Sequence, residues 1–282
     1  MLIGGFSTRR DVELVDFSKN KSLSLPKPAD LPTDMDGLVA DVVNGQVIAC
    51  GGQHSADCYI YSFKSNTWTK TVSMDQKRWG ATSFVHEGKW YILGGGTALS
   101  STLIYENGKF SPGPNMPKQA QFACSVLVNS THFFYAGGQD FGNALQDAYL
   151  VELVSWKWTK LEDMRYRRVN PTCGMVGRNV VVEGGNYYDV NDGNAEMYSL
   201  ETGMLFIGPQ IPTESGRFRD APNVLQLKNT FYVLGGYDEI DYLDTVYQVD
   251  VENTNWKLRN ERLKVPRIDH EVVAIPRSIL KN

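Results

Sequence analysis

The stretch Trp90-Tyr91-Ile92-Leu93-Gly94-Gly95 is an apolar run that ends in two glycines. Five similar runs end at Gly4-Gly5, Gly51-Gly52, Gly137-Gly138, Gly184-Gly185 and Gly235-Gly236. The first glycines of successive pairs are 47, 43, 43, 47 and 51 residues apart. A self-similar period of this length is typical of propellers and solenoids. The sequence therefore predicts six structural units.

The repeated stretch has the composition of a buried strand. Consecutive β-branched and aromatic residues suit a strand that is covered on both faces, and a glycine pair after it permits positive φ and close backbone packing. A second pattern follows each pair, in which large residues recur seven positions apart with turn residues between them. We interpret this pattern as the outer hairpin of a four-stranded blade. The large residues are Tyr61 and Trp68, Val151 and Trp158, Tyr198 and Leu205, and Val249 and Trp256.

With these two patterns the chain resembles the kelch-repeat β-propellers over almost its whole length. The resemblance implies an all-β, six-bladed propeller that forms a single domain over residues 1–282. Residues 267–275 match the start of an interior unit at 78–85, so we expect the C-terminal strand to join the N-terminal blade and close the ring, which removes free sheet edges. We place the blades at 1–30 with 263–282, 31–73, 74–116, 117–163, 164–212 and 213–262.

Composition and motifs argue against several classes of function. The 28 basic and 32 acidic residues nearly balance, so nucleic acid is not an expected partner. No run of eighteen apolar residues occurs, so no membrane partner is expected either. No catalytic, phosphate-binding or metal-binding motif is found, and the copper ligands of galactose oxidase, a kelch enzyme, do not map onto this chain. We predict no cofactor, no metal and no enzymatic activity.

The four cysteines bear on the compartment. Cys50 and Cys58 flank a Gly-Gly turn, where neighbouring strands can bring them within disulfide range, although two free thiols are the alternative. Cys124 and Cys173 fall in expected innermost strands, where we interpret them as small buried hydrophobes. The pair at Cys50 and Cys58 resembles that of secreted invertebrate kelch chains, which implies an extracellular location, with the cytoplasm as alternative. The sequons at Asn20 and Asn129 are possible glycosylation sites if the chain is secreted.

The candidate binding site is one end of the propeller. In a four-stranded meander, the segment before each innermost strand and the loop after each Gly-Gly pair emerge at the same end. These segments are rich in arginine and tyrosine, which are typical of binding hot spots. Basic residues before the innermost strand also have a structural alternative, namely pairing within the blade, for Arg78, Arg168, Arg219 and Arg267. The predicted binding residues are Arg78, Trp79, Arg165, Tyr166, Arg167, Arg168, Tyr187, Tyr188, Arg217, Arg219, Tyr237 and Tyr242.

The leading hypothesis is a non-enzymatic scaffold that binds a protein or peptide on this end, with an acidic rim from Asp189, Asp238 and Asp241. The alternative is binding of a small molecule or glycan at the mouth of the central channel. A propeller enzyme is the third possibility. A pocket with converging polar groups would favour the small ligand, and a wide shallow patch would favour the protein.

Overall fold

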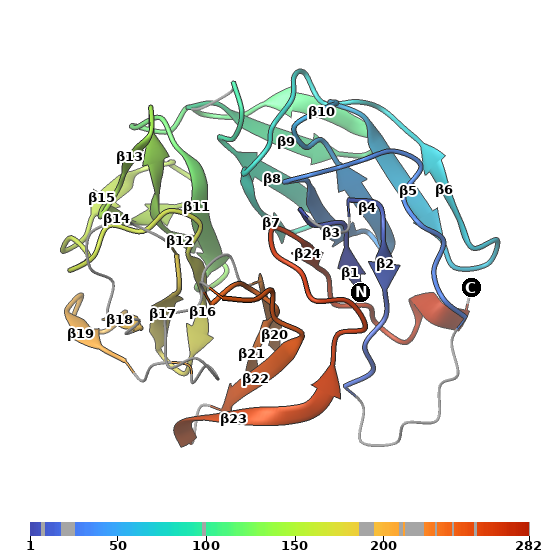
Figure 1. Ribbon diagram of the computed structural model, residues 1–282. Helices are drawn as coiled ribbons and strands as arrows, with labels where there is room; N and C mark the ends of the chain where they lie inside the picture. Colours follow the sequence, from blue (N-terminus) through green and yellow to red (C-terminus); the bar gives the residue numbers. More distant parts are fainter. Residues whose placement is uncertain are drawn as a thin grey trace.

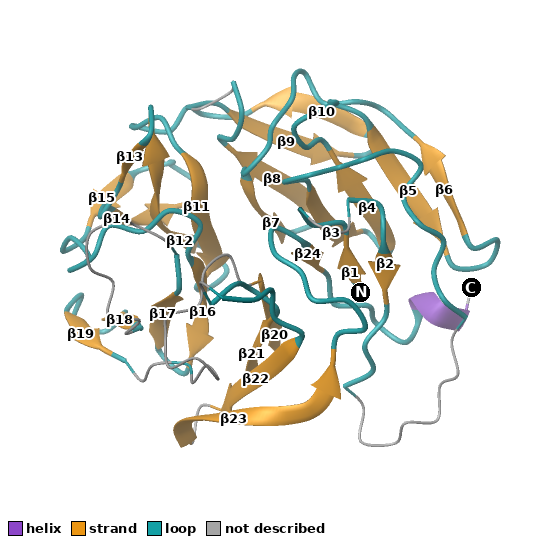
Figure 2. Cartoon of the chain, viewed as in Figure 1, coloured by secondary structure: helices purple, strands orange, loops and turns teal. Residues whose placement is uncertain are grey.

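The computed structural model describes residues 1–6, 9–17, 26–97, 100–185, 195–208, 211, 223–228, 230–238, 240–250 and 253–281. The described chain is almost entirely β-structure, with one short 3₁₀ helix at Ile279–Lys281 (Figure 2). Six sheets are arranged in a ring around a central channel (Figure 1). In five of these sheets the chain runs from an innermost strand to the periphery, and in the sixth the innermost strand comes from the C-terminal segment. The predicted six-bladed propeller is confirmed.

The strands of the first three blades are as follows, from the channel outward. Blade 1 contains β24 (Glu271–Val272), β1 (Leu2–Ile3) and β2 (Val12–Glu13). Blade 2 contains β3 (Val39–Val43), β4 (Gln46–Cys50), β5 (Cys58–Ser62) and β6 (Thr67–Lys70). Blade 3 contains β7 (Thr82–His86), β8 (Lys89–Leu93), β9 (Thr102–Glu106) and β10 (Lys109–Pro112).

The last three blades follow the same order. Blade 4 contains β11 (Gln121–Leu127), β12 (His132–Asp140), β14 (Ala148–Glu152) and β15 (Trp158–Lys160), with β13 (Asn143–Ala144) added to β12. Blade 5 contains β16 (Thr172–Val176), β17 (Asn179–Glu183), β18 (Glu196–Ser199) and β19 (Leu205–Ile207). Blade 6 contains β20 (Asn223–Leu227), β21 (Thr230–Leu234), β22 (Thr245–Asp250) and β23 (Asn253–Arg262).

The ring closes where the two ends of the chain meet. β24 pairs antiparallel with β1, with Leu2 opposite Val272 and Ile3 opposite Glu271. The Val273 amide extends this pairing by donating to the carbonyl of Met1 at 2.9 Å. This confirms the expected closure, in which a C-terminal strand completes the N-terminal blade.

Each glycine pair lies where neighbouring segments leave no room for a side chain. Gly51 and Gly52 have φ of 77° and 97°. A Cβ on Gly51 would lie 2.3 Å from the Met74 methyl group, and a Cβ on Gly52 would lie 2.7 Å from the Asp36 carbonyl oxygen. The pair is therefore required both by backbone conformation and by the crowding that the sequence predicted.

Aromatic residues pack the outer part of the blades. The rings of Tyr61 and Trp68 are 5.0 Å apart, and Trp158 makes edge contacts with Phe133, Tyr135 and Tyr149. Trp68 also donates through Nε1 to the Ala29 carbonyl at 2.9 Å. The residues seven positions apart in sequence are therefore cross-strand partners that fill the blade.

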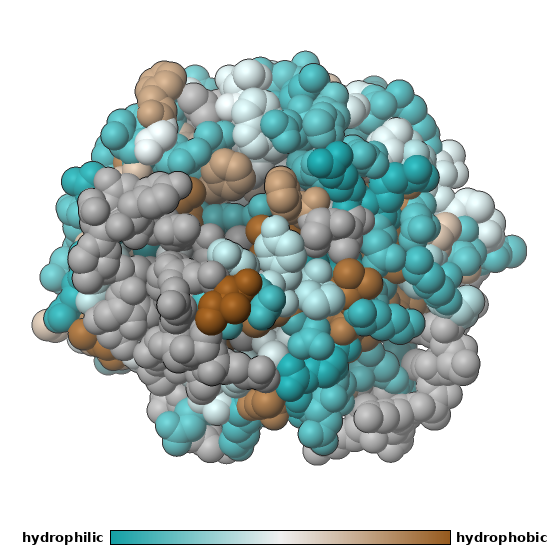
Figure 3. Space-filling view, viewed as in Figure 1, coloured by the Kyte–Doolittle hydropathy of each residue, from teal (hydrophilic) through white to brown (hydrophobic). Residues whose placement is uncertain are grey.

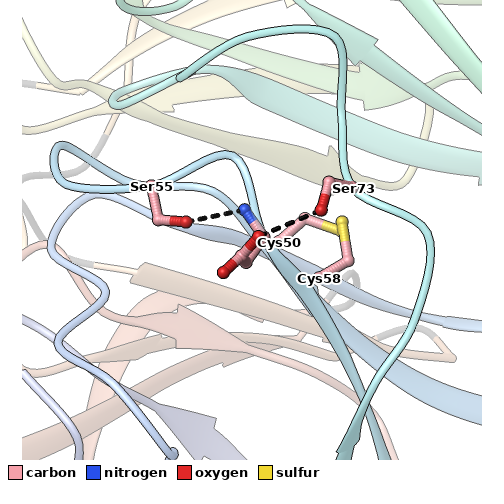
Figure 4. The surroundings of a disulfide bond; sticks show 5 residues. Cys50, Ser55, Cys58 and Ser73 are labelled. Carbon is pink, nitrogen blue, oxygen red and sulfur yellow. Dashed lines mark hydrogen bonds between the residues drawn. A yellow bond between two sulfur atoms is a disulfide. The ribbon is translucent and has the colours of Figure 1, made fainter.

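Both cysteine pairs form disulfides. Cys50 and Cys58 lie directly opposite each other on β4 and β5, with Cα atoms 4.1 Å apart, as predicted. Figure 4 shows this bond beside Ser55 and Ser73, which both contact Asp57. The Ser55 hydroxyl accepts a hydrogen bond from the Asp57 amide, and the Ser73 hydroxyl donates to the Asp57 carboxylate.

Cys124 and Cys173, whose Cα atoms are 5.7 Å apart, join the innermost strands of blades 4 and 5. Their interpretation as unbridged hydrophobes was wrong, because adjacent inner strands bring residues 49 positions apart into contact.

Candidate functional site

The candidate site is the end of the ring that carries the loops after Gly-Gly and the segments before the innermost strands. We call it the loop face. Figure 3 views this face, where apolar side chains stand among hydrophilic ones around the centre. Of the predicted binding residues, Tyr187, Tyr188, Arg217 and Arg219 lie outside the described residues, as does Asp189.

A chain of backbone hydrogen bonds links the blades at the loop-face mouth of the channel. The Gly80 amide donates to the Gly37 carbonyl at 3.1 Å, the Phe122 amide to Gly80 at 2.6 Å, and the Asn170 amide to Phe122 at 2.8 Å. All four residues have positive φ, and Asp269 holds the same position in blade 1 with φ of 51°. The mouth is therefore framed by a regular set of residues with left-handed backbone conformation.

Two of the predicted contact residues, Arg78 and Arg168, are fully buried. Arg78 donates through Nη1 to the Gly94 carbonyl at 3.0 Å, and Arg168 donates through Nη1 to the Gly184 carbonyl at 2.6 Å. Arg267 is buried in the same way and donates to Gly4 at 3.2 Å. Each guanidinium therefore binds the first glycine of a Gly-Gly pair. The structure corrects the predicted site here: these arginines hold the blade together and are not accessible to a partner.

The buried arginines are also paired with carboxylates. Arg168 donates through Nε and Nη2 to Glu196 Oε1 at 3.1 and 3.0 Å, and neither side chain is exposed. Arg267 contacts Asp11 at 2.7 Å and Glu13 at 3.3 Å. Ion pairs in this position compensate the cost of burying a charge.

The other two arginines of the blade 5 segment, Arg165 and Arg167, are exposed. Within the described part of the chain, neither side chain forms a salt bridge. Tyr166 between them is half-buried and lies over the Arg168 guanidinium, with 5.7 Å from Cζ to the ring centroid. Alternating positions of this segment thus face the blade interior and the solvent, which separates structural from accessible side chains.

Trp79 has a packing role beside the mouth. It is half-buried, and a Cβ on Gly96 would lie 2.7 Å from its ring. The Trp79 carbonyl also accepts a hydrogen bond from the Gly96 amide at 2.8 Å. The Trp79 indole therefore packs against the loop of blade 3, and only part of the indole surface is accessible to solvent.

The loop of blade 6 is ordered by its own residues. Tyr237 and Tyr242 form an antiparallel bridge, with ring centroids 5.6 Å apart. The Asp238 carboxylate accepts hydrogen bonds from the amides of Ile240 and Asp241, at 3.2 and 2.9 Å. Asp238 is 4% exposed, so it stabilises the turn and does not belong to an acidic rim. Asp241 and Tyr242 remain exposed.

The predicted binding residues do not include the apolar tips of these loops. Phe6, Phe141 and Ile240 are 51%, 80% and 60% exposed, in blades 1, 4 and 6. Each lies within a few residues of a Gly-Gly pair in a loop that is otherwise polar. That contrast is the signal that could have identified them.

The central channel is a second feature of the site. It has a volume of about 530 Å³ and is lined by the innermost strands, including Asp41 of β3 and Glu271 of β24. Burial raises the pKa of Asp41 to about 6. Burial and the nearby Asp41 carboxylate raise the pKa of Glu271 well above its usual value. No lysine, arginine or histidine is among the described lining residues, so the channel has acidic character.

Comparison with known proteins gives a match in the last repeat. Residues 219–259 match the Kelch motif, and they extend from the segment before β20 into β23. Together with the six-bladed ring, this match supports a kelch-repeat β-propeller. Propellers of this family are commonly protein-binding scaffolds and are generally not enzymes. No helix among the described residues has the length and apolar character needed to cross a membrane.

Proposed function

We propose that this protein is a non-enzymatic scaffold that binds a protein or peptide on its loop face. The observation that supports this most directly is the combination, on one face, of exposed apolar tips with exposed arginines that form no salt bridge to another described residue. Phe141 and Ile240 provide apolar area, and Arg165 and Arg167 provide directional donors. Large apolar side chains and arginines dominate the energetics of protein interfaces.

Two other observations weigh against a small ligand at the loop-face mouth of the channel. Asn170 donates from its side-chain amide to the Asp269 carboxylate, which joins blades 5 and 1 at this mouth. The predicted arginine donors Arg78 and Arg168 are buried. The polar groups that were expected to converge on a mouth-bound ligand are therefore used within the fold.

An extracellular location is part of the proposal. Two cysteine pairs at bonding distance fit an oxidising compartment, since disulfides rarely persist where thiols are kept reduced. Asn129 of the sequon is exposed, and its Oδ1 accepts bonds from the Thr131 and His132 amides at 2.8 Å each.

The test begins with native mass spectrometry of the protein purified from its source, to identify a bound subunit or ligand. Affinity for the identified partner is then measured for Arg167→Ala, Tyr242→Ala and the matched control Val154→Ala. Val154 is 87% exposed in the turn after β14, at the opposite end of the ring. We expect Kd to rise about 30-fold for a loop-face hot spot and to stay unchanged for the control. Equal effects, or an effect of Val154 alone, would show that the loop face is not the binding surface.

A further inference from the structure

The loop of blade 4 is a short β-hairpin. The end of β12 pairs with β13, with Gln139 opposite Ala144 and Asp140 opposite Asn143. The Leu145 amide extends the pairing by donating to the Gly138 carbonyl at 2.8 Å. The hairpin therefore has a fixed register up to its two-residue turn. It is visible at the upper left of Figure 1, as β13 beside the end of β12.

The turn holds an aromatic residue in an unfavourable conformation. Phe141 and Gly142 have φ of 46° and 85°, the signs of a type I′ turn. Asn-Gly is the preferred sequence in such turns, and a bulky residue at positive φ is an outlier that costs backbone energy. Phe141 is also 80% exposed, so the fold recovers little of this cost through packing. An exposed, strained aromatic residue without a packing role indicates a function outside the fold.

The base of the hairpin is attached to the next blade. The Gly138 amide donates to the Arg168 carbonyl at 2.8 Å, and the Arg168 amide donates to the Leu145 carbonyl at 3.0 Å. Arg168 is in turn fixed by its buried contacts with Glu196 and Gly184. The base of the hairpin is thus held in place by the ordered segment around Arg168. Arg165 and Arg167 emerge to solvent from the same supporting segment.

We infer that this hairpin is a preorganised finger whose Phe141 side chain inserts into an apolar pocket of a folded protein partner. This inference rests on the proposed function and names its anchor. The exposed guanidiniums of Arg165 and Arg167 lack an ion pair within the described chain, and they fit carboxylates at the rim of that pocket. A rigid anchor loses little conformational entropy on binding. Preorganisation therefore increases affinity by lowering the entropy cost of association.

Charge favours a protein over a lipid surface as the partner. An anionic membrane would attract a face of uniformly positive charge. The loop face instead carries exposed carboxylates, including Asp34, Asp75 and Asp241, and the chain has a net charge of −4. Insertion of Phe141 into a membrane would bring these carboxylates toward lipid headgroups.

The test uses site-specific photo-cross-linking on the complete chain. The photoreactive analogue p-benzoylphenylalanine replaces Phe141, Tyr242 or Val154 in three separate variants, each irradiated in an extract of the source organism. We expect the Phe141 variant to give one protein conjugate, identified by mass spectrometry. Excess unlabelled wild-type chain should suppress it, and excess Phe141→Asn chain should not. The Val154 variant, equally exposed on the other end, should give none.

The Tyr242 variant separates the two proposals. A conjugate from position 242 without one from position 141 would leave the proposed function standing and overturn the anchor. No specific conjugate from either position would overturn both. Conjugates with lipid in place of protein, or equal conjugation at 141 and 154, would also reject the inference.

A second measurement distinguishes an anchor from a structural residue. Phe141→Asn introduces the preferred turn sequence, so the melting temperature should be unchanged or higher. Affinity for the cross-linked partner should fall about 30-fold. A lower melting temperature with unchanged affinity would assign Phe141 to the fold and reject its role as anchor.

Discussion

The side-chain amide of Asn170 in blade 5 donates a hydrogen bond to the carboxylate of Asp269 in blade 1, across 99 positions of sequence. The two blades are separated in the ring by blade 6. This contact therefore ties together parts of the propeller that share no sheet. Both residues have left-handed backbone conformation, which Asn and Asp tolerate better than most residues.

The first prediction concerns this contact. Asn170→Gly removes the hydrogen bond but keeps a residue suited to positive φ, as in Gly37 and Gly80 of blades 2 and 3. Unfolding free energy should fall by about 1–2 kcal/mol, because the partly buried Asp269 carboxylate loses its donor. Asn170→Ala should cost about 1 kcal/mol more through backbone strain. Chemical denaturation measures both, and equal losses would show that strain at this position is negligible.

The second prediction separates two neighbouring arginines. Arg168→Ala leaves Glu196 buried and unpaired, so unfolding free energy should fall by about 3–5 kcal/mol. Arg167→Ala, at the exposed neighbouring position, should change it by less than about 0.5 kcal/mol. The double variant Arg168→Met/Glu196→Gln should recover part of the loss, since no charge is then left buried. Failure of the double variant to recover would mean that the Gly184 contact carries the stability.

The third prediction concerns the disulfides. Under non-reducing conditions, the intact mass should be lower by about four hydrogens than after reduction, because both pairs are bridged. The bonds span 8 and 49 residues, so loop-closure entropy gives stabilisation of about 2.5 and 4 kcal/mol. Cys124→Ala/Cys173→Ala should therefore lower the melting temperature more than Cys50→Ala/Cys58→Ala. The reverse order would exclude the entropic explanation.

The fourth prediction follows from the acidic channel. The pKa of Asp41 is raised from 3.8 to about 6, so the folded protein keeps a proton that the unfolded chain has lost between these values. Stability is therefore lost as pH rises through this window. His270 acts in the opposite direction, because burial lowers its pKa from 6.5 to about 3. The raised pKa of Glu271 adds to the effect of Asp41.

These opposing contributions are separated by comparing variants. Asp41→Asn retains the oxygen that accepts the Val42 amide bond at 2.7 Å and removes the charge. Its stability relative to wild type should increase between pH 4 and 6, by about 1–3 kcal/mol. Melting temperatures of both chains across this range provide the measurement. A difference that does not change with pH would show that Asp41 does not titrate in the channel as inferred.

The sequence by itself determined the architecture. The Gly94-Gly95 stretch and the five similar stretches reflect two local requirements, a buried strand and a crowded turn, which recur in every blade. Tyr61 and Trp68 likewise meet within one hairpin. Features of this kind depend on neighbours close in sequence, so fold class, blade number and the Cys50 to Cys58 bridge could all be predicted.

Only the tertiary structure decided the function of individual side chains. Arg167 and Arg168 are adjacent and chemically identical, yet one is solvent-exposed and the other is buried against Glu196. Closure of the ring brings Asp41 near Glu271 from opposite ends of the chain. Burial and charge pairing depend on residues from other blades, which no local pattern records. The exposure of Phe141 could not be predicted from the sequence for the same reason. An aromatic residue is accessible only where no segment distant in sequence covers it.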